Sequence, residues 1–365
     1  TGHTVVLQYL ENESFKAKLP TMLQSNDRPD IFYSWGGGVM YDQARAGFLR
    51  DVSSVVPDSY LDTVSAAAAD AFTFEGQRVG LPLQVSQVAW WYNKDLMSQA
   101  GIDVSQIKMW DDLLDAVKQI KAAGITPICM GGKDKWPVHF VWTHLHIRNG
   151  GKGLFLESLN NGGWDRPEYI RSGEQMLELV ELEPFQKGWL AATWPDQAGF
   201  FGDGKCAMAF MGNWMYGAQA SNSASGEGLA DANMGMFNMP MTSGGIGDSG
   251  DTLGGINGWL FSSTASDAAV ELMMHYVSLD IQKEDASNGA YIPIVKGADG
   301  SLTNPFLQQV AKNISNSEYH QIFYDQFLGA DIGRVVNDVS TDLAAGIISA
   351  EEATQAVQEA WEFNQ

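Results

Sequence analysis

Short apolar runs alternate with segments of helical periodicity along this chain, and no other feature of the sequence constrains its fold as strongly. In residues 110–123, leucine, valine and isoleucine recur on one helical face, and Gly124 follows where a helix can end in a left-handed residue. Ser349, followed by Glu351 and Glu352, has the form of a helix N-cap with acidic residues in the first turn. The alternation predicts an α/β protein in which helices cover both faces of open, parallel-rich βαβ sheets.

The size and charge of the chain limit the number of domains it can form and the kinds of partner it can bind. Its 365 residues are enough for two domains with separate cores, and 45% hydrophobic with 18% charged residues is typical of a folded globular protein. The formal net charge of −22 opposes binding to nucleic acid or to anionic membrane surfaces. No run of about 18 apolar residues occurs, so no membrane-spanning helix is expected. Residues 221–251 are rich in Gly, Ser and Asn, which predicts a surface loop around one strand at residues 235–238.

The sequence lacks the motifs that would identify a catalytic, cofactor or metal site. It contains no Gly-x-Ser-x-Gly, no phosphate-binding loop ending in Gly-Lys-Ser/Thr and no dinucleotide fingerprint. His139, His144 and His146 are close in sequence, but on a helix His144 would point away from the other two. We therefore expect no catalytic residues, no metal and no cofactor. The 44 acidic residues could still contain the carboxylate pair of a carbohydrate-active enzyme, which stays an alternative.

Cys129 and Cys206 are the only cysteines, and each lies in an apolar run that is typical of a strand. Neither cysteine has the spacing of a metal ligand. The sequence slightly favours two buried thiols over a disulfide, although an exported protein would permit the disulfide. The pairing is left open.

Several short motifs resemble, in the same order and at similar spacing, those of the extracellular solute-binding proteins of the maltose-binding type, which bind sugars for ABC importers. The most informative is WWYNKDLMSQAGI at residues 90–102, which is similar to the YNKDLF-x-KAGI stretch of that family. Further motifs of this kind cover most of the chain: PDIF at 29–32, GLPL at 80–83, GDGKCAM at 202–208 with GNW at 212–214, GGIN at 254–257, YIP at 291–293 and AG with EEA at 345–353.

The resemblance implies a bilobal fold of the type II periplasmic-binding-protein kind, with two open βαβ sheets joined by a multi-strand hinge. The chain is expected to cross between the lobes near residues 86–90, 255–259 and 319–325. Lobe one is then predicted to comprise residues 1–88 and 260–318, and lobe two residues 89–259 and 319–365. Residues 4–9 with the helix at 15–23 resemble the family's second strand and helix, so the family's N-terminal strand is expected to be missing from the printed sequence.

The function that the resemblance implies is that of a substrate-binding receptor of an ABC importer. Such a receptor binds its ligand between the lobes, closes, and delivers the ligand to permease subunits in the membrane. We expect a monomer without cofactor, located in the periplasm or at the cell surface, whose export signal or lipid anchor is not in this sequence. The 12 Trp, 11 Tyr and 17 Phe favour a di- or oligosaccharide as the ligand, because sugar rings stack on aromatic faces.

Two alternatives to an oligosaccharide receptor stay open. One is a receptor of the same fold for a non-sugar solute such as glycerol-3-phosphate. A phosphate ligand calls for clustered Arg or Lys, of which the candidate loops offer chiefly Lys133 and Lys135. The less favoured alternative is the carbohydrate-active enzyme.

The candidate ligand-binding residues lie where strands or helices meet loops, since ligands of open α/β sheets bind outside the strand ends. The candidate stacking residues precede or follow Gly- or Pro-rich turns: Trp35, Trp136, Trp194 and Trp214. The candidates for hydroxyl recognition are Asn12, Glu13, Gln84, Asp196, Asn257 and Arg334. Asn12 could instead cap a helix, and Arg334 could be a solvated helix residue. Gly254 and Gly255 would allow the backbone to approach the ligand closely, or would only bend a hinge strand.

Overall fold

The computed structural model describes residues 2–365. Its helices are α1 Asn12–Gln24, α2 Gly37–Arg45, α3 Asp58–Leu61, α4 Ala66–Asp70, α5 Lys94–Gln99, α6 Trp110–Ala122, α7 Trp136–Asn161, α8 Pro167–Glu181, α9 Trp194–Gly202, α10 Met215–Ser221, α11 Asp267–Tyr276, α12 Leu279–Ser287, α13 Pro305–Asn316, α14 Tyr324–Phe327, α15 Ala330–Ala344 and α16 Ala350–Phe363. Its strands are β1 Ile31–Ser34, β2 Thr73–Phe74, β3 Gln77–Arg78, β4 Gly80–Asn93, β5 Ile128–Cys129, β6 Met208–Gly212, β7 Met234–Phe237, β8 Thr252–Phe261, β9 Ile292–Pro293 and β10 His320–Ile322.

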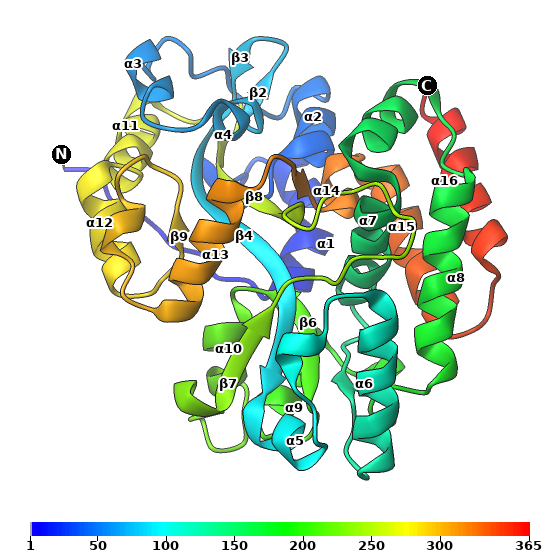
Figure 1. The fold of residues 1–365 in the computed structure, drawn as a ribbon. Coiled ribbons are helices and arrows are strands. Elements are labelled where there is room, and N and C mark those ends of the chain that lie inside the picture. The colour runs from blue at the N-terminus through cyan, green and yellow to red at the C-terminus, as the bar shows by residue number, and fades with distance from the viewer. Residues whose placement is uncertain (1) are drawn as a thin grey trace.

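Strand β4 is 14 residues long and joins the two halves of the molecule (Figure 1). From Gly80 to Gln87 it pairs antiparallel with β8, which also pairs with β1 and β10. From Val88 to Asn93 it pairs instead with β6 and β7. Most of its side chains are buried on both faces, which matches its nearly uninterrupted apolar sequence. One strand therefore belongs to two sheets.

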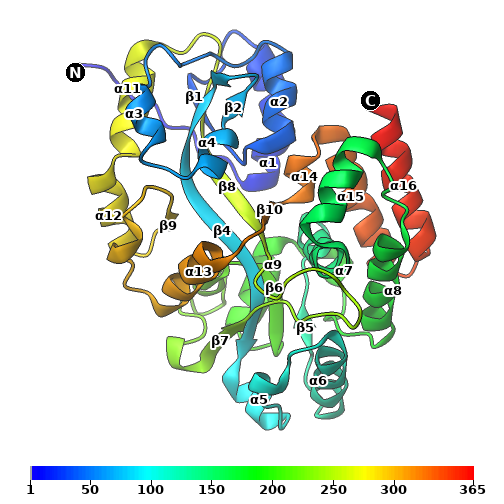
Figure 2. The same ribbon diagram turned by 45° about the horizontal axis from the view of Figure 1, so that its top comes forward.

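Each sheet carries its own set of helices, so the molecule has two bodies (Figures 1 and 2). The first body holds β1, β8, β9 and the first half of β4, with α1 to α4 and α11 to α13 around them. The second holds the rest of β4 with β5, β6 and β7, surrounded by α5 to α10 and α14 to α16. The partners of β4 change between Gln87 and Val88, next to the predicted lobe boundary at residue 88. The full set of lobe boundaries stays a prediction.

Strand pairing differs from the parallel-rich sheets predicted from the alternation. Among residues 2–365, only β5 with β6 and β10 with β8 pair in parallel, and the other pairs are antiparallel. The reason is that β4 and β8, the two longest strands, run in opposite directions through the middle of the molecule.

The strand expected at residues 4–9 is wrong for this structure. Residues 2–11 contain no helix or strand, and Val6 and Tyr9 are 87% and 85% exposed. A β-strand depends on a hydrogen-bonded neighbour, and no strand pairing includes these residues. The helix expected after them is present as α1.

Other helices and strands begin or end where the local sequence motifs predicted. Helix α6 ends before Gly124, whose φ is +75°. Ser349 caps α16 by accepting a hydrogen bond from Glu352 N, and the Glu352 carboxylate accepts one from Ser349 N in return. In the WWYNKDL segment, Asn93 ends β4 and caps α5 through the backbone N–H groups of Asp95 and Leu96. The strand expected at 235–238 is β7.

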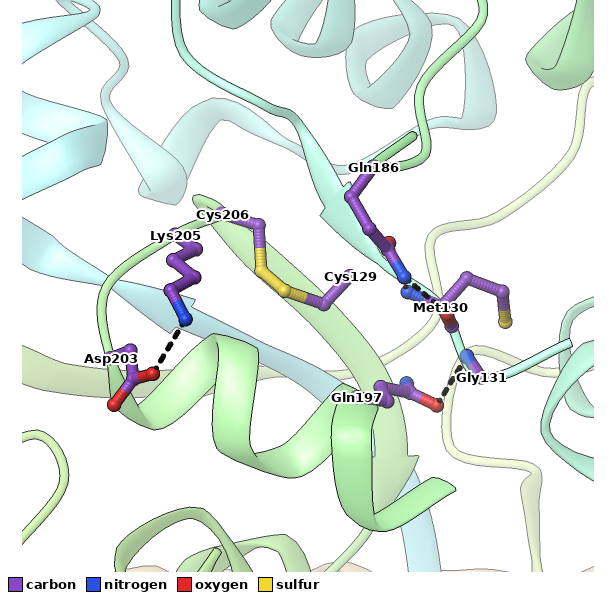
Figure 3. Close-up of a disulfide and its surroundings, with 8 residues drawn as sticks. All are labelled: Cys129, Met130, Gly131, Gln186, Gln197, Asp203, Lys205 and Cys206. Atoms are coloured by element: carbon purple, nitrogen blue, oxygen red, sulfur yellow. Dashed lines mark hydrogen bonds and ion pairs between the residues drawn. A yellow bond between two sulfur atoms is a disulfide. The ribbon is translucent and has the colours of Figure 1, made fainter. Parts of the chain in front are cut away.

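Cys129 and Cys206 form a disulfide, contrary to the slight preference for free thiols (Figure 3). Their Cα atoms are 5.6 Å apart because β5 lies parallel to β6, which begins just after Cys206. The next residues are held by side-chain amides: Gln186 bonds both backbone groups of Met130, and Gln197 accepts from Gly131 N. These contacts fix the loop that leads from β5 to α7.

Candidate functional site

Three of the four candidate tryptophans lie in one aromatic cluster of the second body. The ring of Trp136 is 6.0 Å from that of Trp194 and 6.2 Å from that of Trp214. Phe140, one turn further along α7, contacts both Trp136 and Trp214, and it stacks on Phe323 at 4.9 Å. We call these five rings the aromatic cluster. They meet because α7 and α10 follow the paired strands β5 and β6, and because the first residue of α9, Trp194, donates a backbone hydrogen bond to Asp134, just before α7.

The fourth tryptophan, Trp35, directly follows β1 in the first body and is joined to the cluster through helix α1. The Lys16 ammonium group is 5.2 Å from the ring centre of Trp35 and 5.5 Å from that of Trp136. Glu13 accepts a hydrogen bond of 3.0 Å from the indole N–H of Trp136 and lies 3.5 Å from Lys16. Asn12 donates to the same Glu13 oxygen at 2.6 Å. These contacts connect the first body to the second.

A second set of polar side chains surrounds Tyr33. This tyrosine lies on β1, and its ring is in edge-to-face contact with that of Trp35. Gln84 donates a hydrogen bond of 2.6 Å to the Tyr33 hydroxyl, and it lies opposite Asn257 where β4 pairs with β8. Burial raises the pKa of Tyr33 to about 12, so the phenol stays protonated. The Asn257 side chain is 6% exposed, and its Oδ1 has no hydrogen-bond partner within residues 2–365. A buried amide oxygen without a partner can accept a hydrogen bond from a ligand hydroxyl.

The two glycines of β8 face opposite sides of the sheet. A Cβ on Gly254 would lie 1.7 Å from the Ser86 carbonyl oxygen, so this glycine allows β8 to pack against β4. A Cβ on Gly255 would lie 2.7 Å from the ring of Phe323 and 2.9 Å from Asn257 Oδ1. Gly255 therefore borders the aromatic cluster, whereas Gly254 serves the packing of the sheet.

Two other sequence candidates have partners outside this arrangement. Asp196 forms the capping box at the start of α9 and accepts bonds of 2.8 Å from the Thr193 backbone N–H and hydroxyl. Arg334 is 66% exposed and pairs with Asp338 one turn further along α15. The solvated-helix interpretation of Arg334 thus fits its surroundings. Asn12 is the first residue of α1, but the residue that caps this helix is Glu11.

Carboxylates predominate around the aromatic cluster. Asp134 accepts a bond of 2.7 Å from Trp194 N, and burial raises its pKa above the usual range. Asp325 follows Phe323 by two residues and is 8% exposed. Lys135 is paired with Asp338 at 2.6 Å, whereas Lys16 lies over the rings of Trp35 and Trp136.

The three histidines of α7 do not share a site. His139 Nδ1 lies 2.8 Å from Asn337 Oδ1, whereas His146 packs against Trp142 and Tyr169. His144 packs against the ring of Phe210. Burial lowers the pKa of each of these histidines. In the part of the chain that the structure describes, no three residues of His, Cys, Asp or Glu are grouped as metal ligands.

Sequence reasoning missed two members of the cluster, Phe140 and Phe323, and four residues near it or near Trp35: Lys16, Tyr33, Asp134 and Asp325. For Phe140 a signal existed, because it is four residues after Trp136 and so lies on the same helical face. Phe323 and Asp325 lie within the third predicted crossover, at residues 319–325, which is also a place where a ligand contact could have been expected.

Two α/β bodies share strands, and aromatic and polar side chains converge between them, which is the architecture of bilobal binding proteins. The family comparison agrees with this class. A model of the bacterial extracellular solute-binding protein family matches residues 1–284, and the chain belongs to this family.

Relatives and solved structures extend the comparison. An uncharacterized ABC transporter extracellular-binding protein of Pyrococcus horikoshii is 25% identical over 206 residues, which are 56% of this chain and 46% of that protein. A sn-glycerol-3-phosphate-binding periplasmic protein of Shigella flexneri is 33% identical over 145 residues, which are 39% of this chain and 30% of that protein. The matched part is thus half or less of these relatives' length.

Two solved structures are similar over nearly the whole chain, each at 25% identity. One is a chitin oligosaccharide binding protein, with a TM-score of 0.87 over 99% of this chain and 90% of that one. The other was described with xylan utilization by Caldanaerobius polysaccharolyticus, with a TM-score of 0.89 over 97% and 91%. The bilobal solute-binding fold predicted from the sequence is confirmed. Within residues 2–365, no helix has the length and apolar character that crossing a membrane requires.

Proposed function

We propose that this protein is the substrate-binding receptor of an ABC importer and that its ligand is a di- or oligosaccharide. The observation that carries the proposal is the convergence of Trp35 from the first body with the aromatic cluster of the second. Sugar rings stack on such faces, and a ligand that touches both bodies favours their closed arrangement. Membership in the extracellular solute-binding family and the likeness to a chitin oligosaccharide binding protein support it.

The proposed ligand contacts are of two kinds. Trp35, Trp136, Trp194 and Trp214 supply stacking surfaces, and Glu13, Gln84, Asn257 and Gly255 border the space where hydroxyl groups would bind. Asn12 would act indirectly, by orienting Glu13. Asp196, Arg334 and Gly254 are left out of the proposed site, because their partners account for them.

The charges near the cluster favour a sugar over glycerol-3-phosphate. Asp134, Asp325 and Glu13 bring negative charge to the site, and Lys16, whose ammonium group lies over the rings, already lies beside Glu13. A phosphate dianion would need several free cations or backbone N–H groups. The alternative receptor for glycerol-3-phosphate therefore ranks second, although one relative is named for that ligand.

The remaining parts of the proposal follow from the receptor role. The protein would act as a monomer outside the cytoplasmic membrane, in the periplasm or at the cell surface, and would deliver its ligand to permease subunits. It would bind the sugar without breaking a bond and without a cofactor.

The test is isothermal titration calorimetry against xylotriose, N,N′-diacetylchitobiose, maltose, glucose and sn-glycerol-3-phosphate. We expect micromolar or tighter binding of at least one oligosaccharide, which chromatography recovers unchanged. Tighter binding of glucose than of every oligosaccharide would contradict the ligand class. Binding of sn-glycerol-3-phosphate alone would favour the second candidate, and a consumed sugar would mean that the protein is an enzyme.

A further inference from the structure

A buried carboxylate without a cationic partner lies beside the aromatic cluster. Asp325 Oδ2 accepts hydrogen bonds from the amides of Gln326, at 3.1 Å, and Asn337, at 3.4 Å. Within residues 2–365, the one basic side chain whose nitrogen lies within 4.0 Å of it is His139, whose Nε2 is 3.8 Å from Asp325 Oδ1. That distance is too long for a hydrogen bond. Buried carboxylates are normally paired with a cation, so this one is expected to have a further role.

The hydrogen bonds around Asn337 fix the proton on His139. Because Asn337 donates a hydrogen bond from its NH₂ group to Asp325, its Oδ1 faces His139 Nδ1 at 2.8 Å and must accept a hydrogen bond from the Nδ1–H group. In the neutral ring Nε2 then carries a lone pair, and burial lowers the pKa of His139, which keeps the ring neutral. Nε2 is buried and has no hydrogen-bond partner among the described residues. Two hydrogen-bond acceptors, Asp325 Oδ1 and His139 Nε2, therefore face one another.

This acceptor pair lies where the two bodies meet. The rings of Phe323 and Phe140, each close in sequence to one member of the pair, stack in the aromatic cluster. The next residue after Asp325 touches the first body: a Cβ on Gly37, two residues after Trp35, would lie 3.2 Å from the Gln326 carbonyl oxygen. The ring of His139 also lies 4.9 Å from that of Phe140, so the pair adjoins the aromatic cluster directly.

We propose, building on the sugar-receptor function above, that Asp325 and His139 bind two adjacent hydroxyl groups of the sugar and set the specificity for that diol. Two facing acceptors require two donors, and neighbouring pyranose hydroxyls supply two O–H groups in this spacing. A fully ionised phosphate supplies acceptors only and would be repelled. A sugar that lacks either hydroxyl leaves one of the two acceptors, the buried His139 Nε2 or Asp325 Oδ1, without a partner, which gives sharp discrimination.

The first test is calorimetry of the wild type, Asp325→Asn and Asp342→Asn with xylotriose and N,N′-diacetylchitobiose. Asn has nearly the size of Asp but removes the charge and places a donor where an acceptor is needed. We expect about 10- to 100-fold weaker binding for Asp325→Asn, the range for a hydrogen bond to a charged group. Its unfolding midpoint should equal or exceed that of the wild type, because a buried unpaired charge is removed. Asp342→Asn makes the same charge change on the neighbouring helix α15 and should bind like the wild type.

The outcomes separate this proposal from the receptor function. Wild-type affinity in Asp325→Asn would overturn the diol contact and leave the receptor function intact. A lower unfolding midpoint together with the affinity loss would assign Asp325 a structural role and also overturn it. Absence of sugar binding by the wild type would refute the receptor function for these sugars, and the diol contact with it.

A second measurement uses the wild-type protein and does not depend on a variant that folds. In protein labelled with ¹⁵N histidine, the ring signals of His139, identified by their loss in His139→Gln, should report the tautomer protonated at Nδ1. Saturation with the bound oligosaccharide should shift the Nε2 signal, because its lone pair gains a donor. An Nε2 signal that stays in place at saturation would overturn the proposal.

Discussion

At the scale of single residues, the aromatic side chains of the site owe their positions to their neighbours in the chain. Trp136 and Trp194 are the first residues of their helices, and each is followed by a proline, which the first turn of a helix tolerates. Trp35 is followed by Gly36, whose φ of +65° turns the chain sharply after β1. Each ring is thus presented at the start of an element, where it can face a ligand.

The contribution of Trp35 to binding can be measured against a matched tryptophan. Trp35→Ala should weaken oligosaccharide binding by about 30-fold, or roughly 2 kcal/mol, as is usual for an aromatic residue that contributes much of the binding energy. Trp189→Ala removes a similarly half-buried ring that contacts Phe185 outside the cluster, and should leave affinity unchanged. Equal calorimetric affinities for the wild type and Trp35→Ala would remove Trp35 from the proposed site.

The buried histidines make stability depend on pH. Burial lowers the pKa of His146 to about 3, whereas the unfolded chain takes up that proton near pH 6.5. Below pH 6.5 the unfolded state therefore binds more protons, and the free energy of unfolding falls with pH by about 1.4 kcal/mol per unit. His146→Phe places a ring that cannot be protonated beside Trp142, Tyr169 and Tyr324, and so removes this pH dependence.

Urea unfolding at pH 7 and pH 5 checks this prediction. The wild type should lose about 2 kcal/mol more than His146→Phe over this interval, because the 1.5 pH units below pH 6.5 each contribute about 1.4 kcal/mol. Carboxylate titration is common to both proteins and cancels in the comparison. An equal loss in both would mean that His146 is protonated in the folded protein.

At the scale of elements, the disulfide between Cys129 and Cys206 spans 77 residues of sequence. Closing a loop of that length restricts the unfolded chain, so Cys129→Ala with Cys206→Ala should lower the free energy of unfolding by about 2–4 kcal/mol. Urea unfolding of the oxidised wild type and the double variant gives this difference. A reductant should destabilise the wild type and leave the variant unchanged; a reductant effect on both would point to a cause other than the disulfide.

Secondary-structure elements were predicted well where a few neighbouring residues determine them. They were predicted poorly where contacts with segments distant in sequence determine them. The periodicity before Gly124 and the cap at Ser349 located α6 and α16, since both depend on a few neighbouring residues. The pairing of Cys129 with Cys206 depends on β5 lying beside β6, which no local pattern contains. Residues 4–9 have a strand-like sequence, yet strand formation depends on a neighbour.

The site follows the same division. The tryptophans could be selected because Gly and Pro mark loops, and three of them do meet in the cluster. Asp196 and Arg334 could not be excluded, since a capping box or a helix-surface ion pair is visible only once the partner is known. Asp325 could not be selected as a candidate, because what distinguishes it is its contact with His139, which is far away in sequence.

At the scale of the whole molecule, the two bodies touch at a glycine contact that should affect ligand affinity. Gly38, on α2, packs so closely on Gly329 that a Cβ there would lie 2.4 Å from Gly329 N and 2.5 Å from the Phe327 carbonyl oxygen. Gly38→Ala should therefore separate the bodies and weaken sugar binding about tenfold, since binding must restore their contact.

Small-angle scattering with calorimetry tests this expectation. Gly38→Ala should have a larger radius of gyration than the wild type, and saturating sugar should reduce the difference. Gly47→Ala, at a position with open space around it, controls for the loss of a glycine, although its φ of +74° will cost some stability. Unchanged scattering and affinity in Gly38→Ala would show that this contact does not control closure.

The continuous course of β4 through both sheets has a consequence for how the protein unfolds. A strand that is hydrogen-bonded to β8 up to Gln87 and to β6 from Val88 cannot leave one sheet without loosening the other. Buried side chains from both bodies also form one connected core. In a scanning calorimeter, the two bodies should therefore melt as one cooperative unit, with equal calorimetric and van't Hoff enthalpies. Neither body is then a separable module that could be expressed, exchanged or evolved without the other.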